Sequence, residues 1–189
     1  MFESIAKQFA TTAIALGSML FGTVAGTDAT FTPAELSSNG NEIVITTRLD
    51  DCFTEEMDKL FQSGKSITIN FRMTVHNSNN DVILFNDFYH QVKYSLVDDY
   101  FQVHLSEHER TLSVMTIEEV HDLLASVSNY EVMELSRLEP EEQYQIQLIS
   151  YMEEISLPGR EEQIHLMNYW NNTEPTLRTP AFDRTQFAL

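Results

Sequence analysis

The sequence is poor in several residue types, and each scarcity limits what the protein can be. Cys52 is the single cysteine among 189 residues, so the chain forms no internal disulfide and assembles no cysteine-based zinc site. Lysine and arginine number 11 against 29 aspartate and glutamate residues, which gives a formal net charge of -18. This negative charge repels nucleic-acid phosphates, and we therefore expect no nucleic-acid partner.

Motifs that carry chemistry are also scarce. Neither GxSxG, which presents a nucleophilic serine, nor the phosphate-binding GxGxxG and GxxxxGK[ST] occurs. His104 and His108 lie on a predicted strand and a predicted turn, so their rings need not converge on a metal. His90 shares a strand face with apolar residues, where a lone histidine is usually hydrogen-bonded in the core. We expect no catalytic residue, no cofactor and no metal, and hence no enzymatic activity.

One uncharged hydrophobic stretch stands near the N-terminus, at residues 9–25. It follows Lys7 and ends with Thr23 and Ala25, small residues of the kind that a signal-peptide cleavage site uses. A membrane anchor is the second interpretation, because the stretch lies at the short end of what spans a bilayer, and a buried helix is the third. We predict that residues 1–25 are a signal peptide or an N-terminal anchor. The protein is then exported to the periplasm or another extracytoplasmic space, and it contacts the inner membrane only if this segment is retained.

Alternation of apolar and polar residues from Ile67 to Val75 is the clearest pattern in the chain. It predicts a strand with one face in a core and the other in water. Turn residues join this strand to its neighbours in an antiparallel meander, and Thr54 and Thr116 are the predicted N-caps of two helices. The predicted strands are 42–49, 67–75, 82–96, 100–105, 111–115 and 144–152, the predicted helices are 53–64 and 116–127, and 164–170 is a short helix or strand.

These elements predict a single α+β domain. Its antiparallel β-sheet, a meander of about four to six strands, packs with two α-helices. The domain covers residues 41–170. Residues 26–40 are a polar lead-in, and residues 171–189, which have little periodicity, are expected to form an irregular C-terminal tail.

Three tyrosines stand on the predicted exposed faces of the strands, namely Tyr89, Tyr100 and Tyr151. Tyrosine is enriched in protein interfaces because its ring is apolar while its hydroxyl group tolerates water. We therefore select these three residues as a candidate interaction face. An ordinary exposed position without a binding role is the alternative for each of them.

The order of these features resembles an uncharacterised family of exported bacterial proteins, the domain of unknown function 4390. The family has no assigned activity, cofactor or catalytic residues, so the resemblance implies none. Its members are often encoded beside a nitrogen-responsive membrane sensor kinase, which implies a role in envelope signalling. The sequence departs from the family's Arg-rich strands, so an electrostatic partner of relatives does not carry over. The resemblance runs from about Phe31 to Pro180 and rests on the strand 43–49, the helix end Ser63–Lys65, the helix start Met115–Glu119 and the turn Leu138–Tyr144.

The leading functional hypothesis is a non-enzymatic exported protein that acts by binding another protein. An envelope signalling or membrane protein would dock on a sheet edge or on the face that carries the tyrosines. The alternative is a small-ligand-binding protein with an apolar pocket between the sheet and the helices.

Overall fold

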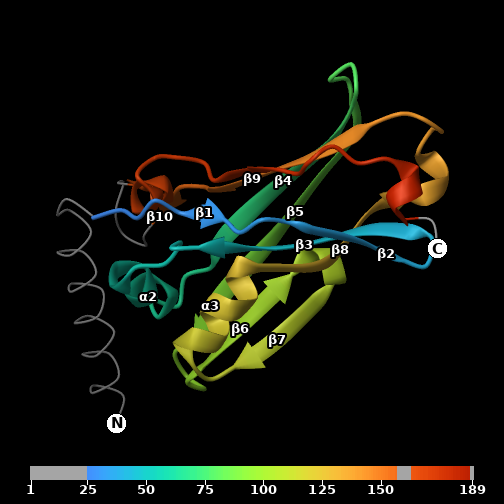
Figure 1. Cartoon of the computed structure of the whole chain (residues 1–189). Helices are drawn as coiled ribbons and strands as arrows, with labels where there is room; N and C mark the ends of the chain where they lie inside the picture. The colour runs from blue at the N-terminus through green and yellow to red at the C-terminus, as the bar shows by residue number, and fades with distance from the viewer. Residues whose placement is uncertain (1–24, 157–162, 188–189) are drawn as a thin grey trace, which may run out of the picture.

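The computed structural model describes residues 25–156 and 163–187. Within them, antiparallel strands form two large sheets, and two α-helices lie beside these sheets (Figure 1). The predicted α+β class is therefore confirmed. Residues 1–24, which hold most of the predicted signal peptide or anchor, lie outside the described residues. In the part of the chain that is described, no helix has the length and apolar composition needed to cross a bilayer.

The larger sheet contains the predicted meander. Its strands are β4 (Ile67–Asn77), β5 (Val82–Ser95), β6 (Tyr100–Leu105), β7 (Arg110–Val114), β9 (Tyr144–Met152) and β12 (Thr176–Arg178). They lie in the order β12-β9-β4-β5-β6-β7. Strands β4 to β7 follow one another in the sequence and pair antiparallel with their neighbours. The antiparallel meander is thus confirmed, and β9 and β12 extend it on the β4 side.

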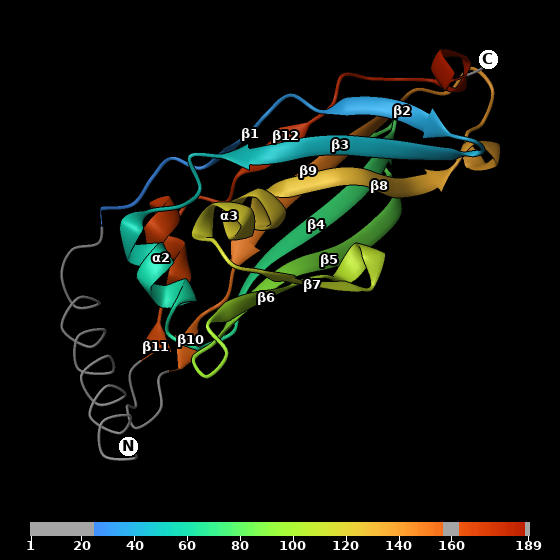
Figure 2. The ribbon, with the colours of Figure 1, turned by 90° about the horizontal axis from the view of Figure 1, so that it is seen from below.

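The smaller sheet consists of β1 (Thr30–Phe31), β2 (Glu35–Asn39), β3 (Glu42–Asp50) and β8 (Ser126–Glu134). Strand β3 lies in its middle and pairs with β1, β2 and β8 (Figure 2). Two strands therefore fall within residues 26–40, the expected polar lead-in. Strand β8 begins inside the predicted helix 116–127, because the helix ends at Ala125. Val127 is buried as part of β8 and not as part of the helical stripe.

Both predicted helices begin at the predicted caps. In α2 (Glu55–Phe61) the Thr54 side chain accepts a hydrogen bond from Met57 N, and in α3 (Ile117–Ala125) Thr116 and Glu119 form a reciprocal capping box. Each cap satisfies amide groups that have no partner within the helix. Short elements complete the described fold: β10 (Ile155–Ser156), β11 (Gln163–Ile164) and the 3-10 helices η1 (Ser106–His108), η2 (Leu135–Arg137), η3 (Leu166–Trp170) and η4 (Arg184–Phe187).

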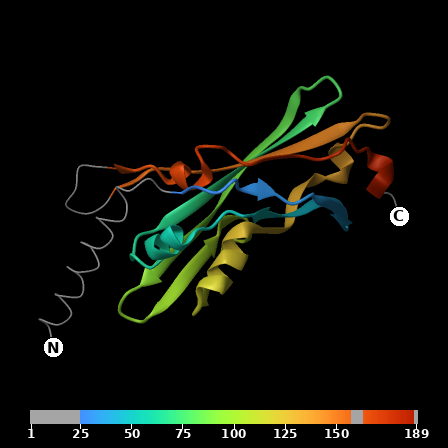
Figure 3. The ribbon, with the colours of Figure 1, turned by 60° about the vertical axis from the view of Figure 1, so that its left-hand side comes forward.

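The core lies between the two sheets, and the helices close one end of it (Figure 3). Alternate residues of β4, from Ile67 to Val75, are all buried, as the period-two pattern predicts. Phe71 is fully buried and its ring stacks on Phe88 at a centroid distance of 4.9 Å. Fully buried side chains of this size each contribute about 1.5–3 kcal/mol to folding. The six-stranded sheet therefore has one face in the core and the other in solvent.

The described part of the C-terminal segment, up to Phe187, lies against the larger sheet. Strand β12 pairs with β9, with Leu177 opposite Leu148. Phe182 is 1% exposed and exchanges two backbone hydrogen bonds with Tyr144, at 2.8 and 2.9 Å. Two apolar side chains separated by polar residues leave too weak a periodic pattern to indicate a strand, although they are enough to hold the segment on the sheet.

Candidate binding face

The solvent side of the six-stranded sheet carries all three predicted tyrosines. Paired residues of antiparallel strands project to the same side of a sheet, so the pairing assigns each residue to a side. We call this solvent side the outer face. It consists of Thr68, Asn70, Arg72, Thr74 and His76 of β4, Val82, Phe85, Asp87, Tyr89, Gln91, Lys93 and Ser95 of β5, Tyr100, Gln102 and His104 of β6, Thr111 and Ser113 of β7, Gln145, Gln147, Ile149 and Tyr151 of β9, and Thr176 and Arg178 of β12.

Two of the tyrosines are brought together and the third is not. Asn70 pairs with Tyr89 on β5 and with Tyr151 on β9, so the two rings flank it. Tyr100 pairs with Ser95 near the β5–β6 turn, on the same face but at a different level of the sheet. Tyr89 also approaches the imidazole of His104, at a centroid distance of 5.6 Å.

Arg72 lies at the centre of this cluster, although the sequence analysis does not select it. Its guanidinium carbon is 5.7 Å from the ring centroid of Phe85 and 5.4 Å from that of Tyr151. Its Nε donates a hydrogen bond of 3.4 Å to Asp87, the residue directly opposite on β5. Cation-π contacts of this kind contribute about 0.5–1 kcal/mol each at exposed sites. The alternating pattern places Arg72 on the wet side of its strand, but its aromatic neighbours come from other strands.

The outer face differs in charge from the rest of the molecule. The whole chain carries 29 acidic residues against 11 basic ones. Among the outer-face positions listed above, Asp87 is the one carboxylate, whereas Arg72, Lys93 and Arg178 are cationic. Acidic groups therefore concentrate on other surfaces, and a partner with negative charge meets the least repulsion here.

A buried histidine–carboxylate pair is the most unusual polar feature of the core. His90 is fully buried, and its ring nitrogens lie 2.9 Å from the carbonyl oxygen of Leu124 and 2.9 Å from Glu107 Oε1. The Glu107 side chain is 4% exposed. Burial by itself raises the pKa of Glu107, but the hydrogen bond and charge of His90 outweigh it and lower that pKa below its usual value. The two side chains thus form a buried histidine–carboxylate contact, and their burial removes them from contact with a substrate.

His104 and His108 do not come together, and Cys52 is buried. His104 Nδ1 lies 3.0 Å from Thr111 Oγ1, and His108 is directed at Glu107 at 3.8 Å, so the two rings do not converge. Across the described residues, no group of three or more His, Cys, Asp or Glu side chains is placed to hold a metal. Burial raises the pKa of the Cys52 thiol to about 12, which keeps it protonated and unreactive at neutral pH.

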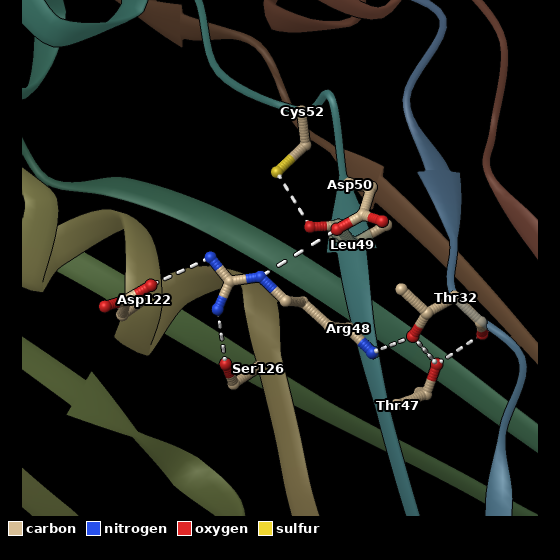
Figure 4. A network of polar contacts seen from close by, with 8 residues as sticks. All are labelled: Thr32, Thr47, Arg48, Leu49, Asp50, Cys52, Asp122 and Ser126. Atoms are coloured by element: carbon tan, nitrogen blue, oxygen red, sulfur yellow. Dashed lines mark hydrogen bonds and ion pairs between the residues drawn. The ribbon is translucent and has the colours of Figure 1, made fainter.

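A polar network near Cys52 links the smaller sheet to α3. Arg48 of β3 binds Asp122 at 2.9 Å and Ser126 at 3.1 Å, while its backbone N–H donates to Thr32 (Figure 4). The side chains of Arg48 and Asp122 are 40% and 72% exposed. An exposed ion pair of this kind contributes about 0–1 kcal/mol to the free energy of folding. We interpret the network as a structural connection between β3 and α3.

One pocket, of about 230 Å³, lies beside the turn that joins β4 to β5. Arg137, Glu139 and Glu142 contribute charge to its wall, and it is not placed between the sheet and the two helices. In position and lining it differs from the apolar pocket that the small-ligand hypothesis predicts. The residues that line it are Asn77, Ile83, Met133, Arg137, Glu139, Glu142 and Tyr144.

Fold and face together define a two-sheet α+β domain with one open sheet face that carries aromatic and cationic side chains. The family described as Domain of unknown function (DUF4390) matches residues 27–171, and the chain belongs to this family. The resemblance found in the sequence is therefore confirmed. Comparison with curated proteins gave no match, and neither did comparison with solved structures.

Proposed function

We propose that this protein is a non-enzymatic binding protein, exported from the cytoplasm, that holds another protein on its outer face. The partner is an envelope signalling or membrane protein. The observation that carries the proposal is the row of Tyr89, Asn70 and Tyr151 beside Arg72 on an open sheet face. Tyrosine and arginine are the residue types most enriched among those that dominate binding energy in protein interfaces.

The shape and charge of the face favour a protein over a small molecule. Small ligands are usually held in concave pockets, whereas a sheet face offers the broad contact area that protein interfaces need. Phe85 and Tyr89 are 54% and 38% exposed, so apolar surface is available for burial by a partner. Export is supported by the uncharged stretch at residues 9–25 and by the exported family that the sequence resembles.

Site-specific photo-crosslinking in native cells tests the proposal. A photoreactive amino acid replaces Tyr89 or Tyr151 of the full chain, and a control replaces Glu131, an exposed residue of β8 in the other sheet. We expect one and the same protein to be linked from both tyrosine positions and not from position 131. Equal yields from all three positions, or none from the outer face, would contradict the proposal.

Export is tested separately by the N-terminus and location of the native protein. A chain that begins after Ala25 in an extracytoplasmic fraction supports a cleaved signal, and a full-length chain in the membrane fraction supports the anchor. A full-length chain in the cytoplasmic fraction would refute export.

A further inference from the structure

We infer that Arg72 is the group that receives the partner, and that the partner presents an aspartate or glutamate side chain to it, next to an apolar residue. This inference rests on the proposed function and specifies the chemistry of the contact. It concerns the outer face alone, because that face combines a fixed cation with exposed apolar surface.

The guanidinium of Arg72 is held in place before a partner arrives. The Phe85 and Tyr151 rings contact it from two neighbouring strands, and Asp87 accepts the hydrogen bond from Nε. The side chain is nevertheless 46% exposed. Its two terminal nitrogens make no hydrogen bond or ion pair with the described residues, so the planar fork is available. A fork that is already oriented loses little side-chain entropy on binding.

A carboxylate is the group that fits this fork best. Guanidinium and carboxylate are both planar, and they form two parallel hydrogen bonds that are each stronger than a neutral one. Asp87 occupies the Nε side, which leaves the terminal nitrogens for a second carboxylate. Lys93 and Arg178 lie on the same face, where Asp87 is the one carboxylate among the positions named above, so the net charge of these positions is positive.

The surroundings of Arg72 indicate a protein carboxylate more than a free anion. Ile149 pairs with Arg72 across β9, and Phe85 lies on its other side with half of its surface exposed. These apolar groups offer contact to a side chain that neighbours the carboxylate in a polypeptide. An inorganic anion would leave them uncovered.

Titration of the isotope-labelled full chain with defined peptides tests the inference. Three amidated peptides of equal length alternate valine with glutamate, glutamine or lysine, and inorganic phosphate is the fourth probe. We expect the glutamate peptide to shift the Arg72 Nε–H signal in NMR spectra with saturation, and to bind about tenfold or more tightly than the other probes. Arg72→Gln should abolish this binding and Arg72→Lys should weaken it about tenfold, because lysine cannot form the bidentate contact.

Arg110→Gln is the matched control. Arg110 is exposed and pairs with Leu105, whose side chain faces the core, so it lies on the other side of the sheet. This variant loses the same charge and should bind the glutamate peptide as the wild type does. Equal weakening by Arg110→Gln and Arg72→Gln would mean non-specific attraction and overturn the inference. Phosphate binding at Arg72 as tight as that of the glutamate peptide would also overturn it, as would concentration-dependent self-association that Arg72→Gln abolishes.

The two proposals fail in different ways. If the crosslinks from positions 89 and 151 persist at full yield in Arg72→Gln, the outer face binds a protein and the carboxylate assignment is wrong. If the glutamate peptide binds through Arg72 while no cellular protein is linked, the carboxylate chemistry stands and the proposed protein partner fails.

Discussion

Replacement of Glu107 by glutamine should destabilise the fold, because it removes one charge of a fully buried pair. The imidazole of His90 lies with Nδ1 2.9 Å from the carbonyl oxygen of Leu124 and with Nε2 2.9 Å from Glu107 Oε1. Removal of one partner of a buried pair costs about 3–5 kcal/mol. A glutamine amide still donates to a neutral His90 ring, and we therefore expect a loss of about 2–3 kcal/mol in the free energy of unfolding.

The same variant should change the response to acid. The pKa of Glu107 in the folded protein lies below the ordinary value of 4.5, because the hydrogen bond and charge of His90 outweigh the opposing effect of burial. A carboxyl group whose pKa falls on folding stabilises the protein above its unfolded pKa, and this stabilisation is lost as the pH falls through the folded pKa. The wild type should lose this contribution below about pH 4.5, and Glu107→Gln should lack this part of the acid sensitivity.

Urea unfolding at a series of pH values, followed by the fluorescence of the single tryptophan, Trp170, measures both effects. Trp170 is fully buried, so its emission reports loss of the core. Glu109→Gln is the control, since Glu109 is exposed in the same turn and its change should stay within about 0.5 kcal/mol. Equal stability of Glu107→Gln and wild type at neutral pH would refute a stabilising contact between Glu107 and His90.

Three further predictions concern the core and its borders. Cys52, with its thiol pKa raised to about 12 and 3% exposure, should react with a thiol reagent at neutral pH only after unfolding, and rapid labelling of the folded protein would contradict this. Thr116→Ala removes the capping box of α3 and should lower the free energy of unfolding in urea by about 1 kcal/mol. Ser113→Ala, at an exposed position of β7, is the control and should leave this free energy almost unchanged. Equal effects of the two variants would argue against the cap. Phe182→Ala should cost about 3–5 kcal/mol, and a loss below about 1 kcal/mol would show that the tail is not part of the core.

Strands of the larger sheet could be predicted from the sequence where one face lies in the core and the other in solvent, because their apolar and polar residues then alternate. Ile67 to Val75 alternate without a break and lie in β4, and the predicted strands 100–105 and 144–152 agree with β6 and β9 at both ends. Thr54 and Thr116 marked the helix starts because capping depends on local residues only. Elements of this kind can be predicted because they depend on residues that are close together in the sequence.

The smaller sheet was largely missed for physical reasons. In β8 the alternation is interrupted, because Asn129 adopts a left-handed backbone and the pairing with β3 shifts register there. Strand β2 is short, and its serines and Asn39 read as a polar segment. Such strands form because β3 offers them backbone groups to pair with. A pairing partner elsewhere in the chain leaves no pattern in the local sequence.

The candidate site, like the fold, could be predicted from the sequence only in part. Alternation places Tyr89, Tyr100 and Tyr151 on strand faces, and the strand pairing puts them on one side of the sheet. The role of Arg72 could not be predicted, since Tyr151 reaches it from a strand far along the chain. Strand register across such a separation depends on the whole core and not on any local motif.

The position of β12 has a consequence for when the protein can fold. Strand β9 needs residues 176–178 as its outer neighbour, and Tyr144 needs Phe182 beside it, so the sheet is incomplete until these late residues have been synthesised. A growing chain without them exposes the edge of β9 and a gap in the core. The native sheet is therefore completed only after the C-terminal segment has been synthesised.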